Sequence, residues 1–381
     1  MRNLPYGKQF IDAQDVKLVV KSLKQKLITS GNYVNKFEKK VSVLLKNKYS
    51  VSCNSGTSAL HLALMSINIK KNDVVIVSSI TFVAAINMLK ILGAKIYLAD
   101  VDTDSGQITT NTVKECIKFN KIKKIKCIIT TYLGGHVNEI ERFYKLKKKL
   151  KCFLIEDACH ALGTKYFIKK KKYSIGSCKH SDLSTFSLHP LKTITSGEGG
   201  LVTTNNRKIY NKIILLRSHG ILRSKQHFQY NVIVPGFNYR LSDINCALAL
   251  SQIKKIPKFL AERKIIAKNY NKLLNKYEKI VSCPILKDNL LSSWHLYQVR
   301  VDFKKMNLSK TNLIKNLLKK GIITQIHYIP IYNHEIYKNL KTKIHKNSKK
   351  FYDRTLSLPI FIGLKYSEQK YIIKSLVELL T

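Results

Sequence analysis

A single lysine, Lys192, lies in a segment rich in small residues that follows an apolar run. The run ends at Ser187, Pro190 prevents it from continuing as a strand, and a glycine-rich stretch, 197–200, follows. A lysine that is partly desolvated at a strand end has a lowered pKa, and its neutral amine can attack an aldehyde. The segment therefore predicts a lysine that captures a carbonyl compound, or else an ordinary loop lysine in a lysine-rich chain.

Two carboxylates, Glu156 and Asp157, end a second apolar run that begins at Phe153. Open α/β sheets bind ligands at the carboxyl ends of their strands. A carboxylate beside a heterocyclic nitrogen keeps that nitrogen protonated, and the ring of pyridoxal phosphate needs this tuning to act as an electron sink. Asp157 would equally suit the N-cap of a helix, and both interpretations stay open on this segment alone.

A third segment, from Cys53 to Leu60, places a small polar turn between a strand and a helix. Backbone N–H groups at a helix N-terminus, with hydroxyls beside them, form an anion site. Ser187, five residues before Lys192, would add another hydroxyl. The segment is neither a Walker sequence nor G-x-G-x-x-G, so no mononucleotide or dinucleotide fold is indicated. A plain capped helix start is the alternative interpretation.

Short β-branched runs that alternate with longer helical patterns would position these residues. Such alternation is typical of an α/β fold with a mostly parallel sheet and helices on its faces. Helices are expected over 57–65 and 83–91, where apolar residues recur at steps of three and four. Strands are expected over residues 49–53, 74–78, 95–100, 126–131, 152–156, 183–187 and 200–204.

The chain of 381 residues is long enough for two domains, because single cores rarely grow beyond about 250–300 residues. Strand alternation stops near 239–256, a lysine-rich helical stretch follows over 260–277, and a β segment appears at 296–303. We therefore expect a large domain over residues 1–250 and a smaller C-terminal α/β domain over residues 251–381.

Composition places the chain among ordinary globular proteins, with 45% apolar and 24% charged residues and no apolar run that predicts a membrane span. The start of the chain lacks the apolar stretch of a signal peptide, and the eight cysteines lack the spacing of a disulfide framework. A cytoplasmic protein is therefore expected. Two Cys/His groups, at 159–160 and 178–180, lack the second pair that would complete a metal site, so no metal is expected.

Lysine supplies most of a net charge of +45. The basic runs at 121–126, 145–151 and 169–172 are spread along the chain and carry no interleaved aromatic residues. Arginine would be the expected choice for bidentate recognition of bases or phosphates. We therefore expect solvated basic faces and no nucleic-acid partner, while the basic surface would help to attract an anionic substrate.

Five segments follow one another along nearly the whole chain: NSGTSAL, SITFVAAINM, EDACHALGT, FSLHPLKTITSGEGG and PGFNYRLSDINCALALSQI. In order and spacing they resemble the DegT family of sugar aminotransferases. The resemblance implies the fold of type I PLP-dependent transferases, aminotransferase activity and pyridoxal 5′-phosphate (PLP) as cofactor. One branch of that family dehydrates its sugar and carries His in place of the cofactor-linked lysine. Lys192 is present here, and His189 lies three positions earlier, so transamination is expected.

The resemblance also implies how individual residues meet the cofactor. Lys192 would form the Schiff base with PLP, and Asp157 would pair with the ring nitrogen. Phe82 would stack on the ring, and His160 would lie against the ring or its 3′-oxygen. An Asn like Asn238 reaches the phosphate from the neighbouring subunit, which implies an obligate homodimer with shared active sites. The other phosphate contacts would be Gly56, Thr57, Ser58 and Ser187.

The ends of the chain narrow the expected substrate. LPYGKQFID near the start, KQKLITSG at 24–31 and GIITQIHYIPIY at 321–332 are similar to family members of the pseudaminic acid route. Such members aminate C4 of a UDP-linked 4-keto-6-deoxy-N-acetylhexosamine, with glutamate as donor. For His327 and Tyr328, packing of a strand in the small domain is the alternative. The implied sugar contacts are Tyr6, Lys26, Leu27, Ile28, Thr29, Ile326, His327, Tyr328, Ile329 and Pro330.

Several alternatives stay open on the sequence. The donor carboxylate needs a cation, and Arg217 and Arg240 are candidates unless each simply pairs with a surface acid. A dTDP- or GDP-linked keto-sugar is the nearest alternative substrate. A binding or regulatory protein of the same fold, for example one that binds nucleic acid through the basic surface, is the alternative from another class. Such a protein would not need Lys192, Asp157 and Ser187 together.

Overall fold

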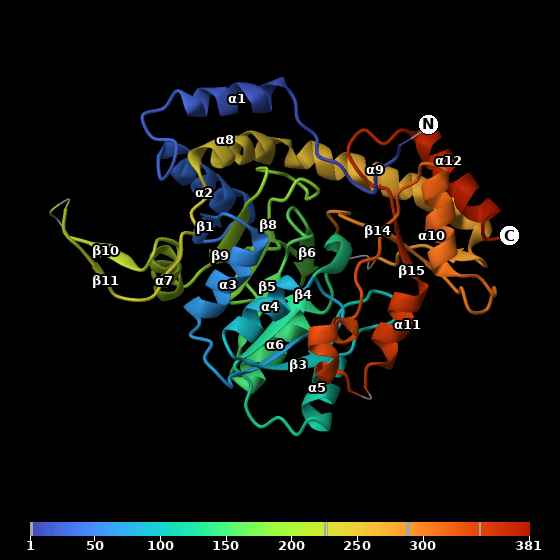
Figure 1. Ribbon diagram of the computed structural model, residues 1–381, viewed down its shortest axis with the longest axis horizontal. Coiled ribbons are helices and arrows are strands. Elements are labelled where there is room, and N and C mark those ends of the chain that lie inside the picture. Colours follow the sequence, from blue (N-terminus) through green and yellow to red (C-terminus); the bar gives the residue numbers. More distant parts are fainter. Residues whose placement is uncertain (1–2, 225, 227, 287–289, 343) are drawn as a thin grey trace.

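A seven-stranded sheet forms the centre of the computed structural model, which describes residues 3–224, 226, 228–286, 290–342 and 344–381 (Figure 1). The strand order is β1-β9-β8-β5-β4-β2-β3, and only β9 runs antiparallel to its neighbours β8 and β1. The predicted mostly parallel α/β fold is confirmed, and each predicted strand end lies within one residue of the observed one. The strands are β1 (Tyr49–Cys53), β2 (Val74–Ser78), β3 (Lys95–Ala99), β4 (Cys127–Thr131), β5 (Phe153–Asp157), β8 (Leu183–Ser187) and β9 (Gly200–Thr204).

Helices cover both faces of this sheet because successive strand residues point to opposite sides. Val75 and Val77 of β2 join the apolar core beneath α3, α4 and α7. Ile76, between them, joins the core with α5 and α6 on the other face, where α2 and α8 form a further cluster. These helices are α2 (Asn32–Leu45), α3 (Gly56–Ser66), α4 (Ala84–Ile91), α5 (Thr110–Phe119), α6 (Ile140–Leu150), α7 (Arg207–Arg217) and α8 (Asp243–Gln252).

The C-terminal part of the chain has its own apolar core around a small antiparallel sheet, β12-β14-β15. Leu4, from the other end of the chain, packs into this core and pairs with Ile322. Conversely, Ile331 and Tyr332 pack into the core with α3 and α4. The boundary after residue 250 therefore stays a prediction. The elements of this part are α9 (Ile256–Leu274), β12 (Val281–Ser282), β14 (Tyr297–Val301), α10 (Lys310–Lys319), α11 (Lys346–Arg354), β15 (Thr355–Leu358) and α12 (Tyr366–Glu378).

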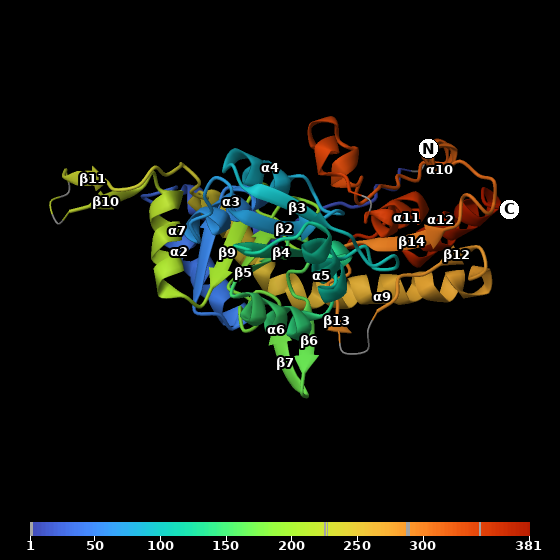
Figure 2. The ribbon, with the colours of Figure 1, turned by 90° about the horizontal axis from the view of Figure 1, so that it is seen from below.

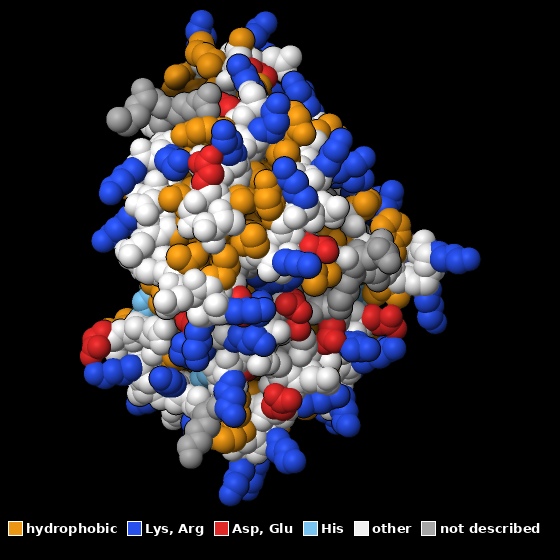
Figure 3. Space-filling model, turned by 90° about the vertical axis from the view of Figure 1, so that its right-hand side faces the viewer, with side chains coloured by type: hydrophobic (Ala, Val, Ile, Leu, Met, Phe, Trp, Pro, Cys, Tyr) orange, Lys and Arg blue, Asp and Glu red, His pale blue; other side chains and the backbone are white. Residues whose placement is uncertain are grey.

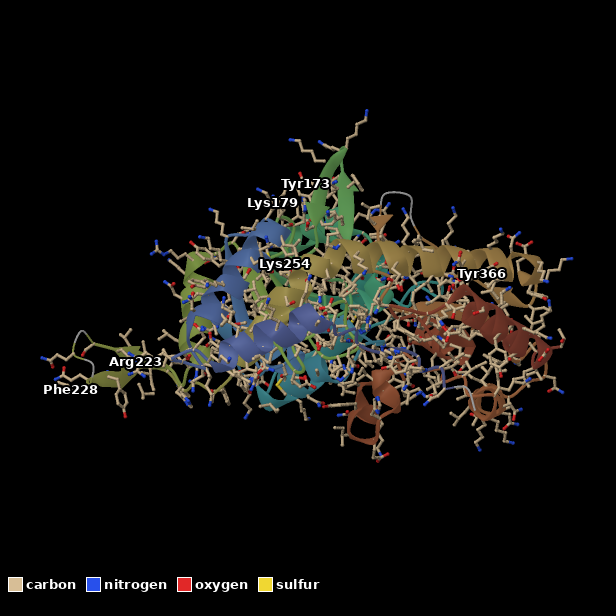
Figure 4. All side chains as sticks on the ribbon, turned by 90° about the horizontal axis from the view of Figure 1, so that it is seen from above. Tyr173, Lys179, Arg223, Phe228, Lys254 and Tyr366 are labelled. Carbon is tan, nitrogen blue, oxygen red and sulfur yellow. The ribbon has the colours of Figure 1, made fainter. Side chains whose placement is uncertain are left out.

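Two hairpins extend away from the body of the molecule (Figure 2). One consists of β6 (Lys165–Ile168) and β7 (Lys171–Ser174), with β13 (Leu290–Leu291) paired to β6. The other consists of β10 (Ile221–Arg223) and β11 (Tyr230–Val232). Figure 4 shows Tyr173 on the first hairpin and Arg223 and Phe228 on the second, at a different end of the molecule.

The surface carries many basic side chains. Lys and Arg are spread over the whole face that Figure 3 shows, with the fewer acidic side chains lying among them. Helix α1 (Ala13–Leu23) packs along α8. None of the helices in the described ranges is long and apolar enough to cross a membrane. All eight cysteines are free thiols.

Candidate active site

Lys192 lies in the loop between β8 and β9, at the carboxyl ends of the parallel strands. The loop turns sharply, since the Lys192 backbone N–H donates to the carbonyl oxygen of His189 at 2.9 Å. The lysine side chain lines a cavity of about 560 Å³ between the sheet and the C-terminal part of the chain. Burial lowers the pKa of the Lys192 ammonium, while Cys159 and Asp157 oppose that shift. A lowered pKa enlarges the neutral fraction of the amine, which is the form that attacks a carbonyl carbon.

Asp157, the last residue of β5, lines the same cavity. Its Oδ1 accepts the backbone N–H of Cys159 at 3.2 Å. Burial raises the pKa of the Asp157 carboxyl, and hydrogen bonding with Cys159 and the charge of Lys192 oppose that rise. Glu156 is buried with a different set of partners, since Tyr132 donates to its Oε1 at 3.0 Å and Ser184 donates to its Oε2. Only the second carboxylate of the pair is thus available to a ligand in the cavity.

The N-terminus of α3 faces the cavity through Gly56 and Thr57. A Cβ atom at Gly56 would lie 2.9 Å from Cβ of Ser187, which is closer than side chains approach one another, so the close contact with β8 requires glycine. Ser58 is used differently, because its hydroxyl donates to Asn54 Oδ1 at 2.6 Å and its backbone N–H donates to Ser55 Oγ at 3.1 Å. Backbone N–H groups and hydroxyls at a helix N-terminus form a site for an anion such as a phosphate.

Aromatic side chains surround the remaining side of the cavity. The hydroxyl of Tyr328 lies 3.0 Å from Nε2 of His160, and the ring of Tyr328 lies 5.7 Å from that of Phe82. His295 packs against His160, with ring centroids 4.2 Å apart. Burial lowers the pKa of the His160 imidazole well below its usual value, and the charge of Lys192 lowers it further. The cavity therefore joins an amine, a carboxylate, an anion site and flat apolar surfaces.

The sequence profile of the DegT/DnrJ/EryC1/StrS aminotransferase family matches residues 9–377 of the chain. The chain belongs to this family. It is a PLP-dependent aminotransferase of fold type I, and the predicted fold class, cofactor and enzyme class are confirmed.

Relatives match this aminotransferase over almost its full length. The UDP-4-amino-4,6-dideoxy-N-acetyl-beta-L-altrosamine transaminase of Campylobacter jejuni subsp. jejuni is 37% identical over 378 residues, which cover 99% of this chain and 97% of the relative. Helicobacter pylori PseC, an aminotransferase involved in the biosynthesis of pseudoaminic acid, has a TM-score of 0.88 and 32% identity, covering 100% of this chain and 99% of that one. The PLP form of a putative sugar aminotransferase from Streptococcus pneumoniae has a TM-score of 0.88 and 25% identity, covering 99% and 98%.

Eleven of the predicted site residues of this aminotransferase lie around one cavity, although they come from distant parts of the chain. They are Tyr6, Gly56, Thr57, Phe82, Asp157, His160, Ser187, Lys192, Ile326, His327 and Tyr328. The other predicted residues lie outside the lining of the cavity in the single chain. They are Lys26, Leu27, Ile28, Thr29, Ser58, Asn238, Ile329 and Pro330. Their predicted roles stay predictions.

Arg217, a candidate for binding the donor carboxylate, is held inside the protein. Its Nη1 lies 2.6 Å from Glu38 Oε1 and donates to the carbonyl oxygen of Ser52 at 2.9 Å. Neither Arg217 nor Arg240 lines the cavity of this chain. The arrangement favours the alternative in which Arg217 pairs with an acid. The acid is Glu38, and the pair is largely buried instead of lying on the surface.

Further residues of the cavity lining carried no prediction. Thr131 ends strand β4 and Tyr132 follows it, so the rule that parallel strands end at one edge could have identified them. Cys159 lies between two predicted residues of the EDACHALGT segment. Gln325 lies in the GIITQIHYIPIY segment, directly before the predicted residues 326–330, whereas no local signal marks His295; both reach the cavity from the C-terminal part. The remaining lining residues are Ser55, Leu60, Ala84, His189, Leu191 and Glu198.

Proposed function

We propose that this aminotransferase transfers an amino group from glutamate to C4 of a UDP-linked 4-keto-6-deoxy-N-acetylhexosamine, as a step of the pseudaminic acid route. The names of the Campylobacter jejuni and Helicobacter pylori relatives, which match over the full chain, support this substrate. The observation that carries the proposal is the cavity itself. It joins Lys192 and Asp157 to Tyr6 and to residues 326–328, the segments expected to contact the sugar.

The residues present fit the cofactor. The aldehyde of PLP would be linked to Lys192, its ring nitrogen would meet Asp157, and its phosphate would lie at Gly56, Thr57 and Ser187. Asp157 is buried, lines the cavity and is oriented by the backbone N–H of Cys159, which donates to its Oδ1. When bound, PLP supplies an electron-withdrawing ring that stabilises negative charge next to the reacting carbon. Phe82 and His160 would confine that ring from the sides.

Lys192 has two tasks in this proposal. Its amine would hold the cofactor covalently, which requires the neutral form that burial favours. The same amine would serve as the base that takes a proton from the donor α-carbon and as the acid that gives it back. The Asp157 carboxylate would supply negative charge beside the ring nitrogen.

The absorbance spectrum of the purified protein tests this function. We expect a visible band with bound PLP, which glutamate bleaches and the UDP-linked 4-keto-sugar restores. Bleaching without restoration by this sugar, but with restoration by a dTDP- or GDP-linked keto-sugar, would replace the proposed substrate by the alternative one. A protein that PLP cannot reconstitute would instead support a non-catalytic binding role.

We also propose that two copies of the chain form a homodimer with shared active sites. Asn238 and residues 26–29 are expected at the phosphate and the sugar, yet they lie outside the cavity of their own chain. Tyr230 and Val232 on the β10–β11 hairpin expose 62% and 55% of their surface, and Leu222 on the paired strand exposes 54%. A group of exposed apolar side chains marks a surface for a protein contact. The hairpin and Asn238 belong to one continuous segment, since the bridge between Ser218 and Asn238 closes its base.

A cytoplasmic location is proposed as well, supported by the eight free thiols.

Mixing two inactive variants tests the sharing of sites. Lys192→Ala removes the amine, and Asn238→Ala removes the residue expected from the partner. Random mixing makes half of the dimers mixed, and each mixed dimer contains one intact site, so about a quarter of the wild-type activity is expected to return. No recovery after verified subunit exchange would contradict shared sites, while leaving the proposed reaction untouched.

A further inference from the structure

His327 lines the cavity from the C-terminal part of the chain, and the protein binds its imidazole ring through one nitrogen. Nδ1 lies 2.9 Å from Oγ of Ser357 on β15. Nε2 has no hydrogen bond with any residue that the structure describes, and protein atoms do not enclose it fully. Because the side chain is only 7% exposed and lines the cavity, Nε2 opens into the cavity.

Two residues of the small antiparallel sheet hold His327 from two sides. Ser357 and Gln298 lie opposite each other on β15 and β14. Ser357 contacts the ring, and Nε2 of Gln298 donates to the backbone carbonyl oxygen of His327 at 3.1 Å. The backbone of Ser357 also exchanges hydrogen bonds of 2.9 and 3.1 Å with Gln325, two residues before His327. The ring of His327 and the backbone around it are therefore tied to the same sheet.

The hydroxyl of Ser357 determines which nitrogen of His327 carries the proton. Burial, and then the charge of Lys192, lower the pKa of His327 to about 3, so the ring is neutral and carries one N–H. Ser357 is buried, and Nδ1 is the one partner of its hydroxyl among the described residues. If Nδ1 donated, the hydroxyl hydrogen would be buried without an acceptor. Oγ therefore donates to Nδ1, and the ring proton lies on Nε2.

The N–H of His327 thus faces a part of the cavity where the protein offers it no acceptor. The ring lies 5.6 Å from that of Tyr6, the other side chain expected to contact the sugar. The cofactor is expected on the sheet side of the cavity, at Asp157 and α3. A donor that is buried in this way needs a partner, and an oxygen of a bound sugar is a suitable acceptor.

We propose that Ser357 and Gln298 are positioning residues, which orient the imidazole of His327 so that Nε2–H donates to an oxygen of the keto-sugar. The inference rests on the proposed function, since it takes this sugar as the substrate. It also joins the two interpretations of His327 that the sequence left open, because one nitrogen packs on a strand while the other faces the substrate.

The first test is a double-mutant cycle in the PLP-loaded enzyme. Ser357→Ala removes only the hydroxyl, and the KM for the UDP-linked 4-keto-sugar is expected to rise about three- to tenfold, the effect of one neutral hydrogen bond. The kcat and the rate at which glutamate bleaches the visible band should change by less than about twofold, because the lost contact only binds the sugar. In a His327→Ala background, Ser357→Ala should not raise this KM further.

A matched control separates positioning from general damage to the sheet. Thr355, on the same strand, is buried, and its hydroxyl donates to the carbonyl oxygen of Phe351 at 2.7 Å, outside the cavity lining. Thr355→Val is expected to lower the Tm and to leave the KM for the sugar unchanged. Gln298→Met removes the donor to the His327 carbonyl and is expected to raise the same KM as Ser357→Ala does.

The second test measures the tautomer without any turnover. The ¹⁵N chemical shifts of the imidazole nitrogens, in protein labelled at histidine, distinguish a protonated ring nitrogen from an unprotonated one. The signals of His327 are those that disappear in His327→Ala. We expect a proton on Nε2 and none on Nδ1 in the wild-type protein.

Four results would overturn the inference. They are a proton on Nδ1 of His327, an unchanged KM for the sugar in folded Ser357→Ala, a Ser357→Ala effect that persists in full in the His327→Ala background, and a slowed reaction with glutamate at an unchanged KM for the sugar. The last result would place the contact on the amino donor. Failure of the wild-type protein to aminate the UDP-linked sugar would instead refute the proposed function, while the tautomer measurement would still stand.

Discussion

The cavity around Lys192 and the β10–β11 hairpin differ in what a single chain supplies. In the cavity, burial and hydrogen bonds from the same chain determine the state of each reactive group: Asp157 is bound by Cys159 N–H, and His160 is held between Gly134 and Tyr328. On the hairpin, Tyr230 and Val232 meet mostly solvent. Changes in the cavity should therefore alter chemistry without altering assembly. Changes on the hairpin should alter assembly first and turnover only through the proposed shared sites.

Lys192→Ala is expected to have the largest effect. It removes both the covalent attachment and the proton transfer, so turnover should fall by roughly 10⁴-fold, the upper end for general acid–base catalysis. The visible band should disappear while the dimer persists, as measured by absorbance and by light scattering. Lys171→Ala on the β6–β7 hairpin is the control. Normal turnover of the Lys192 variant would remove the basis for treating the cavity as the active site.

Asp157→Asn comes next, and Glu156→Gln is its matched control on the neighbouring residue. The loss of negative charge at the ring nitrogen should lower kcat by about 10²–10³-fold, comparable to the loss of one preorganised electrostatic contact. Glu156→Gln should retain most of the turnover and the visible band, because its carboxylate is bound by Tyr132 and Ser184 instead. Equal losses of kcat in both variants would show that the two carboxylates are not divided in this way.

Tyr230→Asp combined with Val232→Asp addresses the hairpin. Two charges at the proposed interface should convert the dimer to a monomer, as measured by light scattering, and should lower turnover about tenfold or more because one charge in an apolar interface already costs several kcal/mol. The monomeric variant should still bind PLP at Lys192. Lys171→Asp on the other hairpin should change neither property. A stable dimer of the double variant would move the proposed interface elsewhere.

Gly56→Ala should have a smaller effect within the cavity. The added Cβ would meet Cβ of Ser187 at 2.9 Å, and such overpacking costs about 1–3 kcal/mol. The Kd for PLP should therefore rise by roughly tenfold, measured by equilibrium titration. Gly7→Ala, whose added Cβ meets nothing closer than Leu191 at 3.7 Å, is the control. If the Gly56 variant bound PLP with the wild-type Kd, α3 would be able to move away from β8 without a loss of binding free energy.

The smallest effect on turnover is expected from lysine substitutions on the β6–β7 hairpin. Lys171→Gln and Lys172→Gln change exposed side chains for which we find no ion pair among the described residues. Turnover should be unchanged, and the free energy of unfolding should change by no more than about 0.5 kcal/mol. A marked rise in KM for the nucleotide-sugar at low salt would instead show that this basic surface steers the anionic substrate.

The amino-acid sequence by itself determined the positions of the seven strands and the polar residues at which several of them end. Apolar runs and the polar residues that follow them are local signals, and parallel strands bring their carboxyl ends to one edge. These signals left an alternative open for each of Asp157, Gly56 and Lys192, and the resemblance of five sequence segments to the DegT family assigned the three residues to one site before the strand order was known.

Only the tertiary structure decided how the side chains at that edge are used. It placed Arg217 in a pair with Glu38, used Ser58 to cap its own helix, and brought His295 against His160. It also placed Glu156 away from the cavity, although Glu156 and Asp157 are equally polar neighbours in the chain. These outcomes depend on contacts between segments that are far apart in sequence. Periodicity and spacing carry no signal for such contacts, because both describe only the chain within a few residues of each position.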